Sequence, residues 1–215
     1  MTFWDFLSSR REVLIFEGYQ HALLVAQCIL IAAVIAVLLA AALYRNERVV
    51  NLATALSAIG LTIPSFALLA LLIVPFGLGV TPTVVALVFY SILPILRNAV
   101  VGLAGVDGAV VESARGMGMS RTRALVRIEL PLAWPVILAG VRISTQMAMG
   151  IAAIAAYVQG PGLGAGIFSG LSRLGGANSL NQALAGTLGI AVLALIFDAI
   201  LVLVGRVTIS RGIRA

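Results

Sequence analysis

The sequence predicts an all-α membrane protein with about five transmembrane helices, and three observations support this fold class. Of its 215 residues, 61% are hydrophobic and only 10% are charged, and the mean hydropathy is +1.13. Several apolar runs reach about 20 residues, the length that a helix needs to cross the roughly 30 Å hydrocarbon layer. The basic residues are fourteen arginines and no lysine, and most of them lie outside these runs. We expect one membrane domain over residues 1–215, because no polar segment is long enough to form a separate core.

Five apolar runs define the expected spans. They cover about 22–44, 52–74, 83–101, 134–157 and 184–204. Pro64 in the second run and Pro94 in the third each remove a backbone hydrogen bond, so each predicts either a static bend or a hinge. Ahead of the first run, the segment 2–16 fits either an amphipathic helix along the outer interface or a disordered tail. The glycine-rich stretch 158–182 predicts an irregular loop with a short helix near 167–171.

The distribution of arginines predicts the orientation of the chain. Basic residues of membrane proteins concentrate in cytoplasmic loops. With five spans and an outer N-terminus, ten arginines would face the cytoplasm: Arg45, Arg48, Arg97, Arg115, Arg121, Arg123, Arg127, Arg206, Arg211 and Arg214. Only Arg10, Arg11 and Arg173 would face outward, while Arg142 lies within the fourth run. We therefore expect an outer N-terminus and a cytoplasmic C-terminus.

The composition also excludes several classes of site. Without lysine, the chain cannot contain a GxxxxGK[ST] phosphate-binding loop, so we expect no ATPase site of its own. Cys28 is the only cysteine and His21 the only histidine, which excludes an intrachain disulfide and argues against a soft-metal site. The net charge of +6 is accounted for by cytoplasmic loops, so it does not indicate binding to nucleic acid.

A polar, basic insert, ESARGMGMSRTRALVRIELP, interrupts the apolar sequence at residues 112–131. We expect a short helix that loosens at Gly116 and Gly118, followed by a second helix that is capped by Ser120 and ends at Pro131. On the second helix the apolar side chains of Leu125, Ile128 and, less closely, Val126 share a side, and three arginines add charge. Such an amphipathic rod fits a groove on another protein, or alternatively anchors on acidic lipid headgroups.

The insert resembles the EAA loop of ATP-binding-cassette importer permeases. That pattern reads EAA, three residues, Gly, nine residues, Ile, one residue and Leu-Pro. The matching positions are Glu112, Ser113, Ala114, Gly118, Ile128, Leu130 and Pro131. Every spacing agrees, and the one departure is serine at 113 in place of alanine. Other stretches, such as TIPSFALLALLIVPFGLGVTPT and GPGLGAGIFSGL, are similar to the osmoprotectant branch, which imports glycine betaine, carnitine or choline.

The resemblance implies a non-enzymatic transport subunit with the MetI-like permease fold in the plasma (inner) membrane of a prokaryote. It implies a cytoplasmic ATPase dimer that binds ATP and magnesium, a second permease copy or paralogue, and an extracytoplasmic solute-binding protein. The loop at about 106–132 would couple the permease to the ATPase. Glu112 would hold the loop through polar contacts, Gly118 would permit a tight turn, and the helix 121–130, including Arg121, Arg123 and Leu125, would form the docking surface.

Alternatives remain at this level. The solute could be another small molecule, such as an amino acid or methionine. From a different class, the chain could be an ion-coupled secondary transporter that uses Asp198, or a scaffold that transports nothing.

Charged and aromatic residues inside the spans are further candidates. Arg142 and Asp198 lie at a similar depth, roughly 10 Å from the cytoplasmic ends of their runs, so we expect an ion pair that acts as a brace or as a gate. Quaternary ammonium groups bind to aromatic faces. Candidate contacts along a translocation path are therefore Phe66, Tyr90 and Tyr157, with Gln146, Met147 and Met149 on the fourth span; packing or lipid contact is the alternative for each aromatic residue.

Overall fold

The computed structural model describes residues 1–209, and all regular structure in this range is helical. The elements are α1 (Phe3–Ser9), α2 (Arg11–Leu43), α3 (Glu47–Thr62), α4 (Ser65–Phe76), α5 (Val80–Ala104), α6 (Gly108–Gly116), α7 (Arg121–Ala124), the π-helical turn η1 (Leu125–Glu129), α8 (Leu130–Ala155), the 3-10 turn η2 (Ala156–Val158), α9 (Gly164–Ser172) and α10 (Ser179–Thr208). Arg211 and Arg214, which entered the orientation argument, lie outside the described residues.

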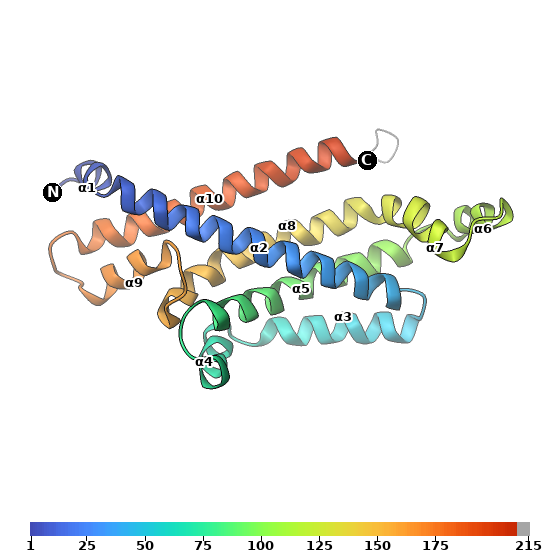
Figure 1. Cartoon of the computed structure of the whole chain (residues 1–215), viewed down its shortest axis with the longest axis horizontal. Coiled ribbons are helices and arrows are strands. Elements are labelled where there is room, and N and C mark those ends of the chain that lie inside the picture. Colours follow the sequence, from blue (N-terminus) through green and yellow to red (C-terminus); the bar gives the residue numbers. More distant parts are fainter. Residues whose placement is uncertain (210–215) are drawn as a thin grey trace.

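Four long helices, α2, α5, α8 and α10, run along the length of the molecule (Figure 1). The N-terminus, α4 and α9 lie at one end, and α6 and α7 lie at the other. Within the described residues, four helical stretches are long and apolar enough to cross a membrane, or five if the bent pair of α3 and α4 is one span. The expected number of about five spans therefore agrees with the structure.

The second expected span, 52–74, is not a single rod. It breaks between α3 and α4, which meet at 90°. Proline disfavours helical backbone in the residue before it, and Ile63 is accordingly extended, with ψ of 124°. The Tyr90 hydroxyl donates a 2.6 Å hydrogen bond to the Ile63 carbonyl, which ties this break to α5. Pro64 thus ends one helix and precedes another, whereas Pro94 stays inside the continuous helix α5.

The centre of the molecule is the packing of α2, α5 and α8. Small residues let the backbones approach closely: a Cβ added at Gly140 would lie 2.8 Å from the Asn98 Cβ and 3.0 Å from the Pro94 carbonyl oxygen. The Ser144 hydroxyl donates a 2.8 Å hydrogen bond to the Ser91 carbonyl across the same contact. The face of α2 that carries Cys28 is also fully buried. These three helices form the frame on which the remaining elements are placed.

Two expectations for the ends of the molecule agree with the structure in part. The segment 2–16 is helical rather than disordered, and it divides into α1 and the start of α2. The Thr2 hydroxyl accepts from the Asp5 amide while the Asp5 carboxylate accepts from the Thr2 amide, a reciprocal cap that starts α1. In the glycine-rich stretch, α9 corresponds to the short helix expected near 167–171.

Candidate functional site

The basic insert forms two short helices at the end of the molecule opposite the N-terminus (Figure 1). The Asp107 carboxylate caps α6 by accepting a 2.9 Å hydrogen bond from the Ala109 amide. The Ser120 hydroxyl accepts from the Arg123 amide at 3.3 Å and so caps α7, as the sequence predicts. The turn between the helices depends on Gly118, whose φ of +83° lies in the left-handed region. A Cβ at this position would meet nothing within 4 Å, so glycine is needed here for its backbone conformation and not for space.

The expectation that the second helix ends at Pro131 was wrong. The Leu130 amide donates to the Leu125 carbonyl, five residues earlier, and α8 continues from Leu130 without a break. A proline in a helix lacks the amide donor, and its ring crowds the carbonyl four residues before it. The wider π-helical turn η1 directly before Pro131 accommodates both defects, since Pro131 then sits in the first turn of α8. The segment 121–129, which we call the rod, is therefore a continuous helical extension of α8.

The apolar side of the rod also differs from the expectation of an outward docking surface. Leu125 and Leu130 pack against a core cluster that includes Tyr44 and Leu103, and Ile128 is half-buried. The exposed side carries Val126, which is 56% exposed, and three arginines at 121, 123 and 127. Any partner would therefore meet a mainly basic surface.

The predicted polar role of Glu112 is not seen in the structure. Its side chain is exposed and makes no hydrogen bond or ion pair with any residue in 1–209. Its neighbour Ala114 is buried, and the Ser113 hydroxyl donates to the Ala109 carbonyl at 2.8 Å. The serine that departs from the EAA pattern thus bonds within its own helix.

A buried polar cluster that the sequence analysis missed joins the rod to α2. Glu129, the last residue of the rod, is only 3% exposed and accepts a hydrogen bond from the Tyr44 hydroxyl. Arg45 donates to the Tyr44 oxygen at 2.7 Å and reaches the Glu129 carboxylate at 3.4 Å. The sequence did contain a signal for this cluster, because Glu129 is an acidic residue next to Leu130 in an apolar seam.

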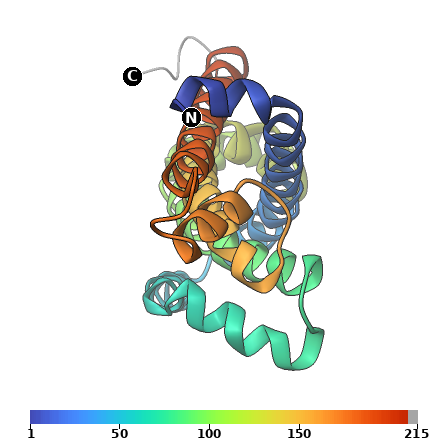
Figure 2. The same cartoon turned by 90° about the vertical axis from the view of Figure 1, so that its left-hand side faces the viewer.

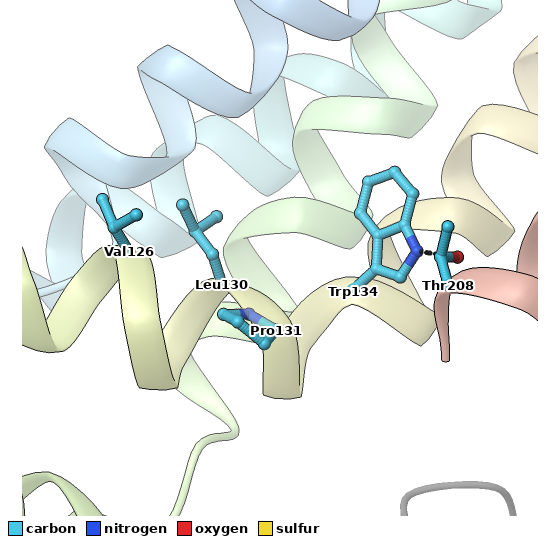
Figure 3. A pocket seen from close by; sticks show the side chains of 5 residues that line it. All are labelled: Val126, Leu130, Pro131, Trp134 and Thr208. Carbon is cyan, nitrogen blue, oxygen red and sulfur yellow. Dashed lines mark hydrogen bonds between the residues drawn. The ribbon is translucent and has the colours of Figure 1, made fainter. Parts of the chain in front are cut away.

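Beside the rod, a hollow of about 320 Å³ opens between the start of α8 and the end of α10 (Figure 3). Its lining consists of Val126, Leu130, Pro131, Trp134 and Thr208. The Trp134 indole donates a 2.7 Å hydrogen bond to the Thr208 hydroxyl, which closes one end of the hollow. The exposed side of the rod is therefore flanked by an apolar recess as well as by arginines.

The structure brings Arg142 and Asp198 together between α8 and α10. The Arg142 Nε donates to one carboxylate oxygen at 2.9 Å, and a terminal guanidinium nitrogen donates to the other at 3.0 Å. Gln146, one turn along α8, donates to the same carboxylate at 3.4 Å. Whether this pair acts as a brace or as a gate stays a prediction.

The residues expected along a translocation path separate into two groups. Phe66 and Tyr157 are exposed and contact each other, with ring centroids 4.8 Å apart. Gln146 is exposed, and Met147 lines a hollow of about 410 Å³ between α3, α5 and α8. By contrast, Tyr90 and Met149 are buried in the core, which removes their side chains from any path in this conformation.

Comparisons with known proteins identify relatives over nearly the whole chain. The family described as "Binding-protein-dependent transport system inner membrane component" matches residues 29–209. The carnitine transport permease protein OpuCD of Listeria monocytogenes is 37% identical over 197 residues, covering 92% of this chain and 87% of the relative. The choline transport system permease protein OpuBB of Bacillus subtilis is 34% identical, covering 98% and 95%.

A third relative, the osmoprotectant import permease protein OsmY of Salmonella typhimurium, is 34% identical, covering 93% of this chain and 84% of the relative. Among solved structures, a chain of the inward-facing MetNI methionine ABC transporter superposes with a TM-score of 0.75. This match covers 96% of this chain and 99% of that chain at 19% identity, and it shows that the two share a fold.

Proposed function

This chain belongs to the family of binding-protein-dependent transport system inner membrane components, and from that membership we propose that it is the permease subunit of an ATP-driven importer for osmoprotectants such as glycine betaine, carnitine or choline. The observation that carries the proposal is the identity of 34–37%, over nearly the full length, to permeases named for the transport of these solutes. A permease for another small solute, such as an amino acid, is the alternative within the family.

If transport is driven by ATP, a separate subunit must hydrolyse it, because this sequence lacks the lysine of a phosphate-binding loop. We assign ATP and magnesium to a cytoplasmic ATPase dimer, and solute capture to an extracytoplasmic binding protein, as the family description implies. A second permease, either an identical copy or a paralogue, would complete the membrane part.

Transport would proceed by alternating access. ATP can shift the permease between inward- and outward-open states only if the ATPase interacts differently with the two. We assign the contact with the ATPase to the rod, since its exposed arginines and the hollow beside it offer a docking surface. Because the rod is continuous with α8 and is held to α2 through Glu129, a displacement at its tip would move both helices together.

We also propose that the rod lies in the cytoplasm and that the N-terminus and α9 lie outside. Two introduced cysteines can test the orientation and the docking surface in one experiment. One variant, Arg123→Cys, places a cysteine on the exposed side of the rod. The matched control, Arg173→Cys, places one at the end of α9. The native Cys28 is fully buried, so it should not react with a bulky thiol reagent.

In intact cells, a membrane-impermeant maleimide should label position 173 but not position 123. A thiol cross-linker should join position 123, and not position 173, to the ATPase. Labelling of position 123 from outside, or absence of any cross-link to the ATPase, would contradict the assignment.

The solute class is tested by uptake into proteoliposomes that contain the complete importer and its binding protein. We expect uptake of radiolabelled glycine betaine, carnitine or choline to require ATP inside. Uptake by this chain alone, driven by an ion gradient, would instead indicate a secondary transporter. If the importer takes up an amino acid with ATP but none of these three solutes, the chain belongs to another branch of the family.

A further inference from the structure

Three aromatic rings from three separate elements meet at the end of the molecule that carries the N-terminus. Phe66 lies in the first turn of α4, Tyr157 lies in η2, and Phe168 lies on α9. The Tyr157 ring is central: its centroid is 4.8 Å from that of Phe66 and 5.8 Å from that of Phe168. The interplanar angles of 54° and 59° give tilted walls rather than a flat stack. Tyr157 is 61% exposed and Phe66 46% exposed, so the rest of this chain leaves both rings uncovered.

The backbone around the rings holds them in place. Phe66 follows the break at Pro64, whose position the Tyr90 hydroxyl secures through the Ile63 carbonyl. The Gly79 amide donates a 2.7 Å hydrogen bond to the Val158 carbonyl, which fixes η2 against the start of α5. On α9, a Cβ added at Gly170 would lie 2.5 Å from the Ser179 carbonyl oxygen, so α9 packs directly on the backbone of α10. The turn η2 contacts both α4 and α9, so it connects the elements that carry the three rings, at the end of the molecule that faces the viewer in Figure 2.

We propose that Phe66, Tyr157 and Phe168, which we call the ring site, form a transit site for the quaternary ammonium group of the solute at the outer mouth of the permease. The proposal rests on the proposed function, because that function supplies the trimethylammonium group. A quaternary ammonium carries a delocalised positive charge and no N–H donor, so the negative faces of aromatic rings are suitable partners for it. Phe168 was not among the residues that the sequence analysis selected.

The surroundings favour this occupant over a metal ion or an ordinary amine. No Asp or Glu occurs in α4, η2 or α9, so these elements supply no carboxylate that would hold a metal or accept hydrogen bonds from an amine. Within residues 1–209 the Tyr157 hydroxyl makes no hydrogen bond, which leaves the face of its ring as its main feature. An aromatic belt at a lipid interface favours Trp and Tyr for their polar tips, whereas two of these three rings are phenylalanines.

A site made of rings alone would bind weakly, which suits a position that solute must leave as readily as it enters. Each exposed cation–π contact changes affinity by about two- to fivefold. Selectivity would come from charge rather than size, since a neutral group of the same shape gains only apolar contact. This difference gives a specific test.

The probes are choline and its uncharged isostere 3,3-dimethylbutan-1-ol, titrated by saturation-transfer NMR against the permease–ATPase complex in nanodiscs without binding protein. We expect Tyr157→Leu, Phe66→Leu and Phe168→Leu each to weaken choline binding by about two- to fivefold. Binding of the neutral alcohol should change less. The control is Tyr19→Leu, which removes an exposed tyrosine ring on α2, outside the ring site, and should bind choline like the parent protein.

Equal weakening for the two probes would show only apolar packing and would overturn the ring site, as would unchanged choline binding in all three leucine variants. If a leucine variant does not assemble, pentafluorophenylalanine at position 157 keeps the ring shape but removes its negative face, and it should weaken choline binding selectively. Uptake assays keep the two proposals distinct. Failure of the complete importer to transport any trimethylammonium solute refutes the proposed function, whereas normal uptake with unaltered choline binding in the ring variants refutes the ring site alone.

Discussion

Removal of the Tyr44 hydroxyl tests whether the buried cluster stabilises the junction of the rod with α8. In Tyr44→Phe the Glu129 carboxylate stays 97% buried but loses its shortest partner and keeps only Arg45, at 3.4 Å. Removing one partner of a fully buried ion pair costs about 3–5 kcal/mol. Arg45 remains as a partner and its side chain is 40% exposed, so we expect a smaller loss, about 2–3 kcal/mol.

Glu129→Gln should cost less than Tyr44→Phe. The glutamine oxygen can still accept from the Tyr44 hydroxyl, no buried charge is stranded, and Arg45 can turn to water, so the loss should be about 1 kcal/mol. The matched control is Tyr157→Phe, which removes a hydroxyl that has no hydrogen bond within residues 1–209, and it should leave stability unchanged.

Two measurements on the assembled importer check this reasoning. Thermal unfolding in detergent should rank the variants, with Tyr44→Phe least stable, then Glu129→Gln, and Tyr157→Phe equal to the parent protein. The ratio of solute imported to ATP hydrolysed should fall in Tyr44→Phe, because a loosened rod can move without carrying α2. A Tyr44→Phe protein as stable and as tightly coupled as the control would refute the reasoning.

Three further predictions concern other parts of the chain. Gly118→Val should abolish uptake without preventing membrane insertion, whereas Gly118→Asn should keep much of it, because asparagine tolerates positive φ and a β-branched residue does not; equal loss in both would point to a requirement other than backbone conformation. If the pair acts as a brace, the swap Arg142→Asp/Asp198→Arg should retain uptake in transport assays; lost uptake in a correctly folded swap would favour the gate. The Thr2 hydrogen bonds lower the pKa of Asp5, so its contribution to α1 is present above the ordinary pKa of an aspartate and is lost as pH falls through the lowered value; amide exchange in α1 should therefore accelerate in acid, and Asp5→Asn should remove that dependence.

Much of the fold could be read from local sequence. The apolar runs predict the long helices because the hydrocarbon layer imposes a minimum length, and α2, α5, α8 and α10 extend beyond each predicted range at one or both ends. The caps at Ser120 and the turn at Gly118 were also predictable, since both depend on the chemistry of one or two neighbouring residues. The approximate depth of Arg142 and Asp198 along their helices was visible in the same way.

Other features depended on contacts between distant segments. The direction of the bend at Pro64 is held by Tyr90, 27 residues away in sequence from the carbonyl that it binds. The continuation of the helix through Pro131 requires the π-helical turn before it. The partial burial of Leu125 depends on a cluster to which α2 and α5 contribute. Periodicity marks a face as apolar, but it does not say which neighbour covers that face.

The sequence by itself determined the class of the molecule: a bundle of apolar helices, a basic insert with the spacing of a coupling loop, and no nucleotide site of the lysine-dependent type. Only the tertiary structure decided that Glu129 is tied to Tyr44, that the rod presents arginines rather than leucines, and that Phe168 joins Phe66 and Tyr157. The physical reason is the separation in sequence between the residues that interact. Chain length, hydropathy and capping act over a few residues, whereas a buried hydrogen bond or a group of rings exists only after helices distant in sequence have packed together.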